Sequence, residues 1–180
     1  YGMYRPLVAL AYAFELSQIA GNLSRETLRA VSRQGLDALT AAERDAWGLV
    51  PDPGAAVRGP QLDAVFVGHC ELIDRDRLTP LVDAQLARDG SLAGAMVAGD
   101  GDGAVLIAGS GHTRDDIGVP VYLKRLDPDA VILSIGQRET ADGAVGEAGP
   151  YDFTAFALAI DRPDPCERMR QFLEARKKSG

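Results

Sequence analysis

The sequence predicts an α/β domain with a parallel or mixed central sheet flanked by helices. The main observation is that short apolar runs typical of buried strands alternate with longer segments of helical periodicity. In addition, 46% of the 180 residues are apolar, which is ordinary for a globular protein, and this length suffices for a sizeable core. We therefore expect a single domain over residues 1–180 that ends in a helical tail at residues 161–180.

The chain begins directly in a predicted helix, residues 4–16, with neither an initiator Met nor a signal-peptide pattern. An α/β domain usually opens with a strand. We therefore expect the domain to be N-terminally incomplete, with a first strand and its loop preceding Tyr1.

Capping signals locate the next two helices. One begins after the N-cap Ser24 and breaks or ends at Gly35. Thr40 and Glu43 have the spacing of a capping box, which predicts the start of a short third helix. The segment that follows, residues 50–60, is rich in Pro and Gly and is predicted to be a loop.

Short apolar or alternating runs predict strands over residues 17–22, 104–110, 130–137 and 151–160. The polar, glycine-rich segment 139–150 is predicted to form a hairpin or a loop. Residues 115–126 are predicted to form a short turn and helix.

Charge and composition exclude several classes of protein. The net charge of −7 argues against a surface that binds nucleic acid or anionic membranes. No run of 18 apolar residues is present, so the sequence predicts no transmembrane helix. With two cysteines, two histidines and no CxxC motif, a zinc site made only of protein ligands is not expected.

The longest helical pattern covers residues 78–99 and carries an unusual pair of polar residues. At about 100° per residue, one face of this helix carries Leu78, Val82, Gln85, Asp89, Leu92 and Met96. A carboxylate on such an apolar face is costly unless it is paired, and Arg88, His69 and His112 are the available partners. Either Gln85 and Asp89 form the floor of a pocket, or the helix is rotated so that both lie at a wet margin.

His112 lies in the stretch AGSGHTRDDIGVP, residues 108–120, just past the predicted strand 104–110. Open α/β sheets bind ligands beyond the carboxyl ends of their strands, and the flanking glycines permit a sharp turn and a close approach of ligand. The alternative is an ordinary strand-to-helix turn in which the histidine only caps the next segment.

Several short motifs follow one another in a recognisable order: YRPL, AGNLSRE, GLDAL, GHC, AQLARDGSLAGAM, LIAGSGHTRDDIGVPVYL, YDFTAF and DPCE. Together they span nearly the whole chain, and their ordered combination resembles the ChaN-like family of haem-binding uptake proteins in the Tiki superfamily. The family's opening strand and its Gly-Glu-x-His-type motif would lie upstream of Tyr1. GSGH resembles the family's Gly-Asn-Gly-His turn, with Ser110 in place of the Asn.

The resemblance implies a haem-binding protein of an iron or haem uptake pathway. It implies one cleft formed by His112, Arg114, His69, Gln85 and Asp89, together with Asn22 and Arg25. A tyrosine would be the axial iron ligand, and the candidates are Tyr4, Tyr12 and Tyr122, with His112 as a distal or alternative ligand. Arg114 or Arg25 could hold the haem propionates.

The resemblance also implies a periplasmic or outer-membrane lipoprotein and a possible homodimer. Contact with a membrane would then occur only through a lipid anchor that this chain lacks. We also expect a disulfide between Cys70 and Cys166, because the resemblance places the protein outside the cytoplasm, where such bonds persist. The alternative is two separate buried thiols.

An enzyme is the second hypothesis, because the wider superfamily resembles metal-dependent proteases and erythromycin-esterase-like hydrolases. His112 or His69 would then be a general base or metal ligand oriented by Asp89. A third possibility is a binding module that has lost its ligand. We rank a haem-binding protein first.

Overall fold

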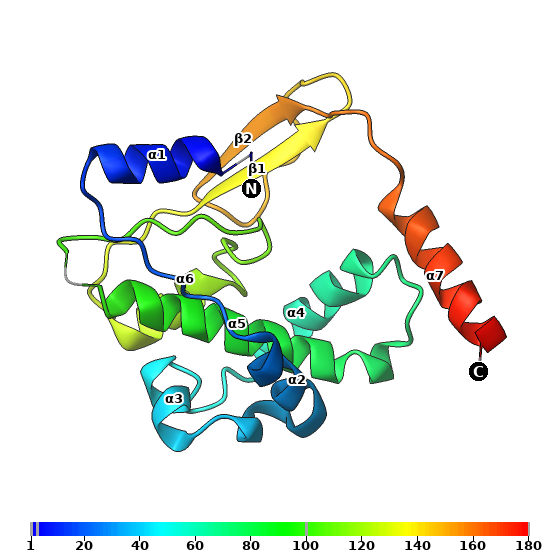
Figure 1. Cartoon of the computed structure of the whole chain (residues 1–180), viewed down its shortest axis with the longest axis horizontal. Coiled ribbons are helices and arrows are strands. Elements are labelled where there is room, and N and C mark those ends of the chain that lie inside the picture. Colours follow the sequence, from blue (N-terminus) through cyan, green and yellow to red (C-terminus); the bar gives the residue numbers. More distant parts are fainter. Residues whose placement is uncertain (1, 3, 100, 180) are drawn as a thin grey trace.

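A long central helix, α5 (Thr79–Val97), organises the fold in the computed structural model shown in Figure 1. The structure describes residues 2, 4–99 and 101–179, and the side chains of residues 2, 4–99 and 101–175. Helices α2 (Arg25–Gln34), α4 (Ala55–Gly68) and α6 (Val119–Leu126) pack against α5, as do the short 3₁₀ helices η1 (Gly35–Ala38) and η2 (Arg75–Arg77). These elements form a helical body.

The hydrophobic core lies in this body. Every buried hydrophobic residue of the described chain falls between Val31 and Leu123, and the largest side chains include Tyr122, Leu78 and Leu86. The prediction of a buried face on α5 is confirmed for Leu78, Val82, Asp89 and Leu92. It was too narrow, however, because Ala84, Leu86, Ala87 and Ala93 on other faces are buried as well. Because other helices pack against α5 from several sides, its buried residues are not confined to one apolar face.

The predicted capping signals are confirmed. Ser24 accepts a hydrogen bond from the Thr27 amide (3.0 Å), and Gly35 ends α2 with φ +69°. Thr40 and Glu43 form both hydrogen bonds of a capping box at the start of α3 (Ala41–Ala46).

The predicted loop at residues 50–60 was too long. The Asp52 carboxylate accepts a hydrogen bond from the Gly54 amide (2.8 Å), and Gly54 turns the chain with φ +77°. The turn is therefore completed by Gly54, and α4 begins at Ala55 with Pro60 inside it.

Two parallel strands, β1 (Ile135–Thr140) and β2 (Phe153–Leu158), pair in register from Ile135↔Phe153 to Thr140↔Leu158. The fold class is therefore mixed α/β with parallel strands, as predicted. The segment between the strands is a loop and not a hairpin, because a hairpin would make the strands antiparallel.

The strands predicted over residues 17–22 and 104–110 are wrong, and the strand predicted over residues 130–137 begins only at Ile135. Residues 17–22, 104–110 and 130–134 contain no strand among the described residues. An apolar run becomes a strand only where a neighbour pairs with its backbone, and in the described chain these runs have none. Val105 is 90% exposed and Val131 is fully exposed.

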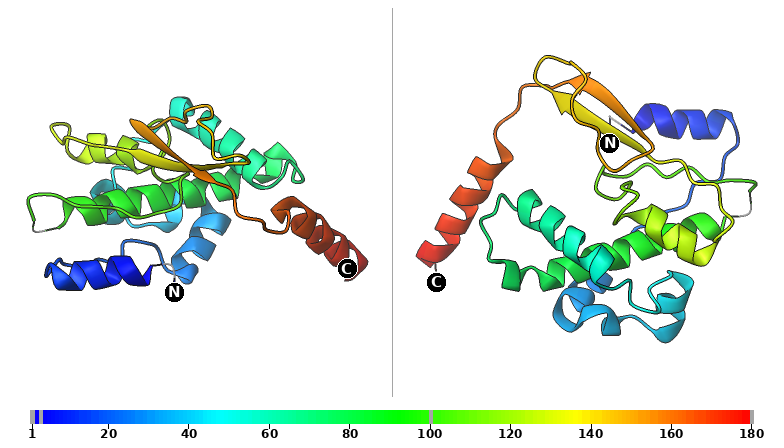
Figure 2. Two further views of the ribbon diagram at one scale, coloured as in Figure 1. Left: turned by 90° about the horizontal axis from the view of Figure 1, so that it is seen from above. Right: turned by 180° about the vertical axis from the view of Figure 1, so that it is seen from behind.

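The first and last helices lie outside the core, as the views in Figures 1 and 2 show. Helix α1 (Arg5–Ala13) has no buried residue. Helix α7 (Pro165–Ser179) projects from one end of the molecule. Both helices were predicted. None of the described helices combines the length and apolar character needed to cross a membrane.

Candidate functional site

A pocket of about 330 Å³ opens between α4, α5 and the loop that precedes α6. We call it the dyad pocket. Helix α4 contributes Gln61 and Val65, helix α5 contributes Gln85 and Asp89, and the loop contributes residues 109–112 and Arg114. The pocket thus brings together Gln85, Asp89, His112 and Arg114, four of the residues predicted to share a cleft.

Asp89 and His112 form the centre of this pocket. The His112 Nδ1 lies 2.5 Å from an Asp89 carboxylate oxygen. Because an ionised carboxylate can only accept, Nδ1–H is the donor, so whenever the ring is neutral its lone pair is on Nε2. In the described part of the chain, no hydrogen bond engages Nε2. The dyad therefore presents one oriented nitrogen atom that can act as a base or as a metal ligand.

Burial changes the acidity of Asp89, which is only 1% exposed. Removal of the carboxylate from water raises its pKa to about 6, while the hydrogen bond and charge of His112 and the charge of Arg88 oppose that rise. The carboxylate is therefore held in its charged form near neutral pH mainly by its partners.

The loop that carries His112 is fixed on both sides of the histidine. The His112 amide donates to the Gly109 carbonyl (2.9 Å), and the His112 carbonyl accepts from the Val119 amide (2.8 Å). A Cβ at Gly118 would lie 2.4 Å from the His112 carbonyl oxygen, so only glycine allows this close approach. The turn therefore sets the position of the imidazole before any ligand binds.

Gln61 is a pocket residue that the sequence analysis missed. It is 6% exposed, and its Oε1 has no hydrogen-bond partner among the described residues. Val57, Gln61 and Val65 are spaced four residues apart on α4 and are all buried. This spacing could have identified Gln61 from the sequence. A polar residue on an otherwise apolar helix face is the same signal that pointed to Gln85 and Asp89 on α5.

Two other predicted site residues lie away from the pocket on the surface. Asn22 and Arg25 are exposed at the start of α2, where the Asn22 side chain accepts from the Leu23 amide (2.8 Å). Neither residue lines the dyad pocket. The pocket observed in the structure therefore contains fewer residues than the cleft implied by the resemblance, because Asn22 and Arg25 are not part of it.

The candidate tyrosines also lie outside the dyad pocket. Tyr4 and Tyr12 are exposed at α1. Tyr122 is fully buried in the core, its hydroxyl has no partner among the described residues, and burial raises its pKa. An iron atom therefore has no open path to the Tyr122 oxygen, and a phenolate there is disfavoured.

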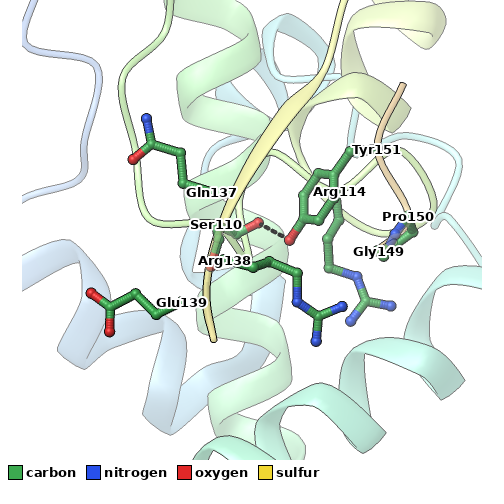
Figure 3. Close-up of a pocket in the computed structure, with 8 residues that line it drawn as sticks. All are labelled: Ser110, Arg114, Gln137, Arg138, Glu139, Gly149, Pro150 and Tyr151. Atoms are coloured by element: carbon green, nitrogen blue, oxygen red, sulfur yellow. Dashed lines mark hydrogen bonds between the residues drawn. The ribbon is translucent and has the colours of Figure 1, made fainter. Parts of the chain in front are cut away.

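A second pocket, of about 310 Å³, adjoins the first, and the two share Ser110 and Arg114. Figure 3 shows it between the loop at Ser110, strand β1 and the segment 149–151. We call it the arginine pocket, because Arg114 and Arg138 both line it. Tyr151 contributes a phenol that donates to the Ser110 carbonyl (3.1 Å).

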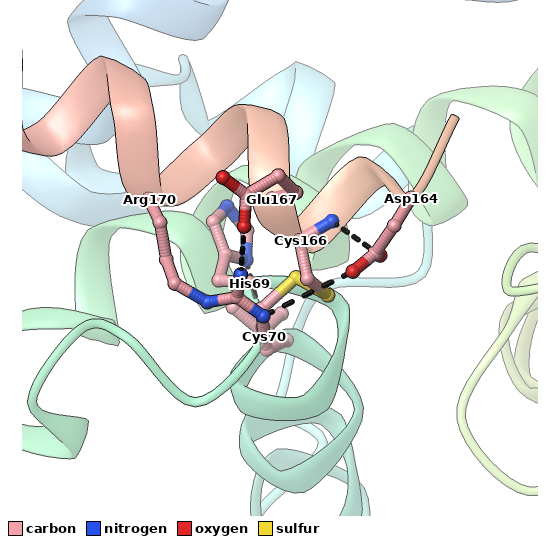
Figure 4. The surroundings of a disulfide bond; sticks show 7 residues. His69, Cys70, Asp164, Cys166, Glu167 and Arg170 are labelled. Carbon is pink, nitrogen blue, oxygen red and sulfur yellow. Dashed lines mark hydrogen bonds and ion pairs between the residues drawn. A yellow bond between two sulfur atoms is a disulfide. The ribbon is translucent and has the colours of Figure 1, made fainter.

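The predicted disulfide is confirmed. Cys70 and Cys166 are bonded, with an S–S distance of 2.03 Å. Figure 4 shows the bond between the end of α4 and the start of α7, where the Asp164 carboxylate accepts from the Cys166 amide (2.9 Å). His69 lies at this bond and not in the dyad pocket, which corrects its predicted place. Helix α4 carries it one turn past Val65, whose carbonyl is 2.7 Å from the His69 Nδ1.

A comparison with protein families identifies the family of this chain. The family model described as haem-binding uptake, Tiki superfamily, ChaN, matches residues 1–123. The chain belongs to this family. The matched part contains all of α4, α5 and the His112 loop, whereas β1, β2 and α7 lie beyond it. Searches of curated proteins and of solved structures found no match to the chain.

Proposed function

We propose that this chain binds haem at the dyad pocket as part of haem uptake. The observation that carries the proposal is the pair formed by the buried Asp89 and the partly exposed His112, which lines the pocket and whose Nε2 has no hydrogen bond to described residues. The family match, which covers this pair, supports the same ligand.

The donor set fits haem better than a free metal ion. No cluster of three or more His, Cys, Asp or Glu side chains suited to a metal ion occurs within the described residues. A catalytic zinc needs about three protein ligands, whereas the iron of haem is held by its porphyrin and needs only axial ligands. One oriented histidine is therefore sufficient for haem.

Each residue of the pocket has a role in this proposal. His112 would offer Nε2 to the iron, and Asp89 would keep the imidazole in the required tautomer and orientation. Ala64, Val65 and Ile117 provide apolar contact for a porphyrin edge, and Arg114 provides a cation for a propionate. In this proposal haem is the transported ligand, and its iron belongs to the ligand and is not a resident metal of the protein.

Titration with ferric haem, followed in the Soret region, tests the proposal. We expect His112→Gln to change the Soret band and to weaken binding, and Asp89→Asn to weaken it by about 10- to 100-fold, as loss of a partner of a ligating histidine does. His69→Gln is the matched control, because His69 does not line the dyad pocket, and it should bind like the wild type. Equal affinities of all three variants would refute the dyad pocket as the site.

The axial ligand predicted from the resemblance is a tyrosinate, and it is tested separately. We keep Tyr4 and Tyr12 as candidates, because both are exposed, and rank Tyr122 last, because it is buried. A high-spin ferric spectrum that is lost in Tyr4→Phe or Tyr12→Phe would identify a phenolate ligand. An unchanged spectrum in both variants would leave the His112 imidazole as the proposed ligand.

We also propose that the protein works outside the cytoplasm, in the periplasm or at the outer membrane. The disulfide supports this location, because such bonds persist in oxidising compartments. Thiol counting on denatured, unreduced protein isolated from its native compartment should find no free thiol. The resemblance also implies a homodimer, and we propose that one forms when haem binds. Sedimentation of the protein with and without haem tests this.

A hydrolase remains a second candidate, because an aspartate–histidine pair can also act as a general base. Ser110 lines the same pocket, but no hydrogen bond joins its hydroxyl to His112 in the described chain. Hydrolysis of a chromogenic ester that is abolished in His112→Gln and unaffected by haem would favour the hydrolase over the haem-binding protein.

A further inference from the structure

The arginine pocket contains an arginine, Arg138, that forms no ion pair with any residue that the structure describes. Arg138 on β1 donates through Nη1 to the Glu147 carbonyl (3.0 Å), and no carboxylate pairs with it among the described residues. Glu139, the next residue, is paired with Arg162. The carboxylate nearest in sequence is therefore paired with another arginine, and within the described part of the chain the guanidinium charge of Arg138 has no anionic partner.

A second guanidinium faces the same space. Arg114 is held by both of its hydrogen bonds to Asp116 (2.8 and 2.6 Å), which orient the group and leave its Nη1 without a hydrogen bond to described residues. Figure 3 shows the guanidinium groups of Arg114 and Arg138 on one side of the pocket, while the Glu139 carboxylate points to the other side. The pocket therefore offers N–H donors of both groups to one location, and the positive charge that no described carboxylate balances is that of Arg138.

Tyr151 gives this pocket a fixed wall. A Cβ at Gly136 or at Gly149 would lie 2.4 Å from a carbon of the Tyr151 ring, so the ring packs where only glycine leaves room. The Tyr151 hydroxyl donates to the Ser110 carbonyl (3.1 Å), and the Asp115 amide donates to the Pro150 carbonyl (3.0 Å). Strand β1 and the segment 149–151 are thus fastened to the loop that carries His112.

We propose that the arginine pocket binds a carboxylate group, with Arg138 and Arg114 as its N–H donors. A planar guanidinium matches a carboxylate through two parallel hydrogen bonds, and Arg138 has donors left for this purpose. Because the two pockets share Ser110 and Arg114, a ligand whose body lies in the dyad pocket can reach Arg138 with an acidic side chain. In this form the inference rests on the proposed function. Arg138 lies outside the family match at residues 1–123, which assigns it no role.

Binding of ferric haem and of its dimethyl ester, measured side by side, tests the inference. The ester lacks free carboxylates but keeps the porphyrin and iron. We expect Arg138→Gln to weaken haem binding about 10-fold, the effect of one charged hydrogen bond, and to leave binding of the ester unchanged. Arg138→Lys, which keeps the charge but loses the planar fork, should lose part of the affinity. Arg29→Gln, which removes a charge from the exposed face of α2, is the control.

Two results would overturn the inference while leaving the proposed function intact. One is wild-type haem affinity in Arg138→Gln, and the other is an equal loss for haem and ester. If the wild type binds neither porphyrin, the proposed function fails and succinate becomes the probe. Succinate binding by calorimetry that Arg138→Gln removes would then support a site for free carboxylates, and no succinate binding would overturn it.

Discussion

The helical body and the segment that follows it differ in how they are held together. Between Val31 and Leu123 the chain contains every buried hydrophobic residue that the structure describes. After Leu123, the only described residues that are buried are Ser134 and Gly136. We call residues 124–179 the C-terminal region. The body is stabilised by burial of apolar surface, whereas among the described hydrophobic residues of the C-terminal region only Leu126 and Ile132, both partly buried, pack against that core.

The C-terminal region is instead joined to the body by particular bonds. Cys166 is bonded to Cys70, the Ser134 hydroxyl donates to the Thr113 carbonyl, and Tyr151 and Pro150 bond to the backbone at Ser110 and Asp115. These three polar links all reach residues 110–115, the loop that contains His112. The contrast shows that the His112 loop belongs to the body but is also held by the C-terminal region, so the bonds that hold this region also hold one wall of the candidate site.

Removal of the disulfide should have the largest effect. The bond joins residues 96 apart in sequence, and in the chain-entropy model closing a loop of that length stabilises a protein by about 4 to 5 kcal/mol. We expect the Cys70→Ser/Cys166→Ser variant to lose a free energy of unfolding approaching that value in urea denaturation. Limited proteolysis should also cut first between β2 and α7. Unchanged urea midpoints would contradict the view that this bond stabilises the body.

A matched pair of leucines tests the contrast in packing. Leu86 on α5 is fully buried, and Leu158 on β2 is 64% exposed. Leu86→Ala should lower the free energy of unfolding by about 2 to 5 kcal/mol, because it leaves a cavity in the core. Leu158→Ala should change it by no more than about 0.5 kcal/mol. Similar losses from the two substitutions would mean that the C-terminal region has a core of its own.

The buried carboxylate predicts a pH dependence. The pKa of Asp89 is raised from 3.8 to about 6, so the folded state binds this proton more tightly than the unfolded state does. This contribution to stability is complete below about pH 4 and is lost as the pH rises through 6. Relative to Asp89→Asn, the wild type should therefore lose up to about 3 kcal/mol between pH 4 and pH 7, at 1.36 kcal/mol per pKa unit.

Chemical denaturation of both proteins at several pH values measures this difference. Because the side chain introduced by Asp89→Asn carries no charge, subtraction removes the titration of groups that do not interact with Asp89, and the remaining difference belongs to Asp89 together with its partner His112. A difference that stays constant from pH 4 to pH 7 would mean that Asp89 titrates normally in the folded protein.

A smaller loss of stability than at the disulfide, Leu86 or Asp89 is expected at the link between Ser134 and Thr113. Ser134→Ala removes one hydrogen bond, so the free energy of unfolding should fall by about 1 kcal/mol. The local effect should be clearer: amide hydrogen exchange should speed up in β1 and β2 and in the His112 loop, and remain unchanged in α5. Faster exchange in α5 would show that the two regions open together.

Local chemistry was sufficient for the sequence to predict several features of this protein. The caps at Ser24 and Thr40 and the stop at Gly35 depend on residues within one or two turns, so their patterns could be recognised directly. The polar pair Gln85 and Asp89 stood out on the helical wheel for the same reason, and both line the pocket.

Tertiary structure decided which distant groups meet. His112 pairs with Asp89, which is 23 residues away in sequence. The sequence offered His69 as an equally suitable partner for Asp89, but His69 lies at the disulfide instead. The apolar runs at residues 17–22 and 104–110 read like strands, but strand formation depends on a neighbour supplied by the fold, and only β1 and β2 pair among the described residues. Gln61, Arg138 and Tyr151 reach the two pockets through helix packing and strand pairing, which no periodicity in the sequence specifies.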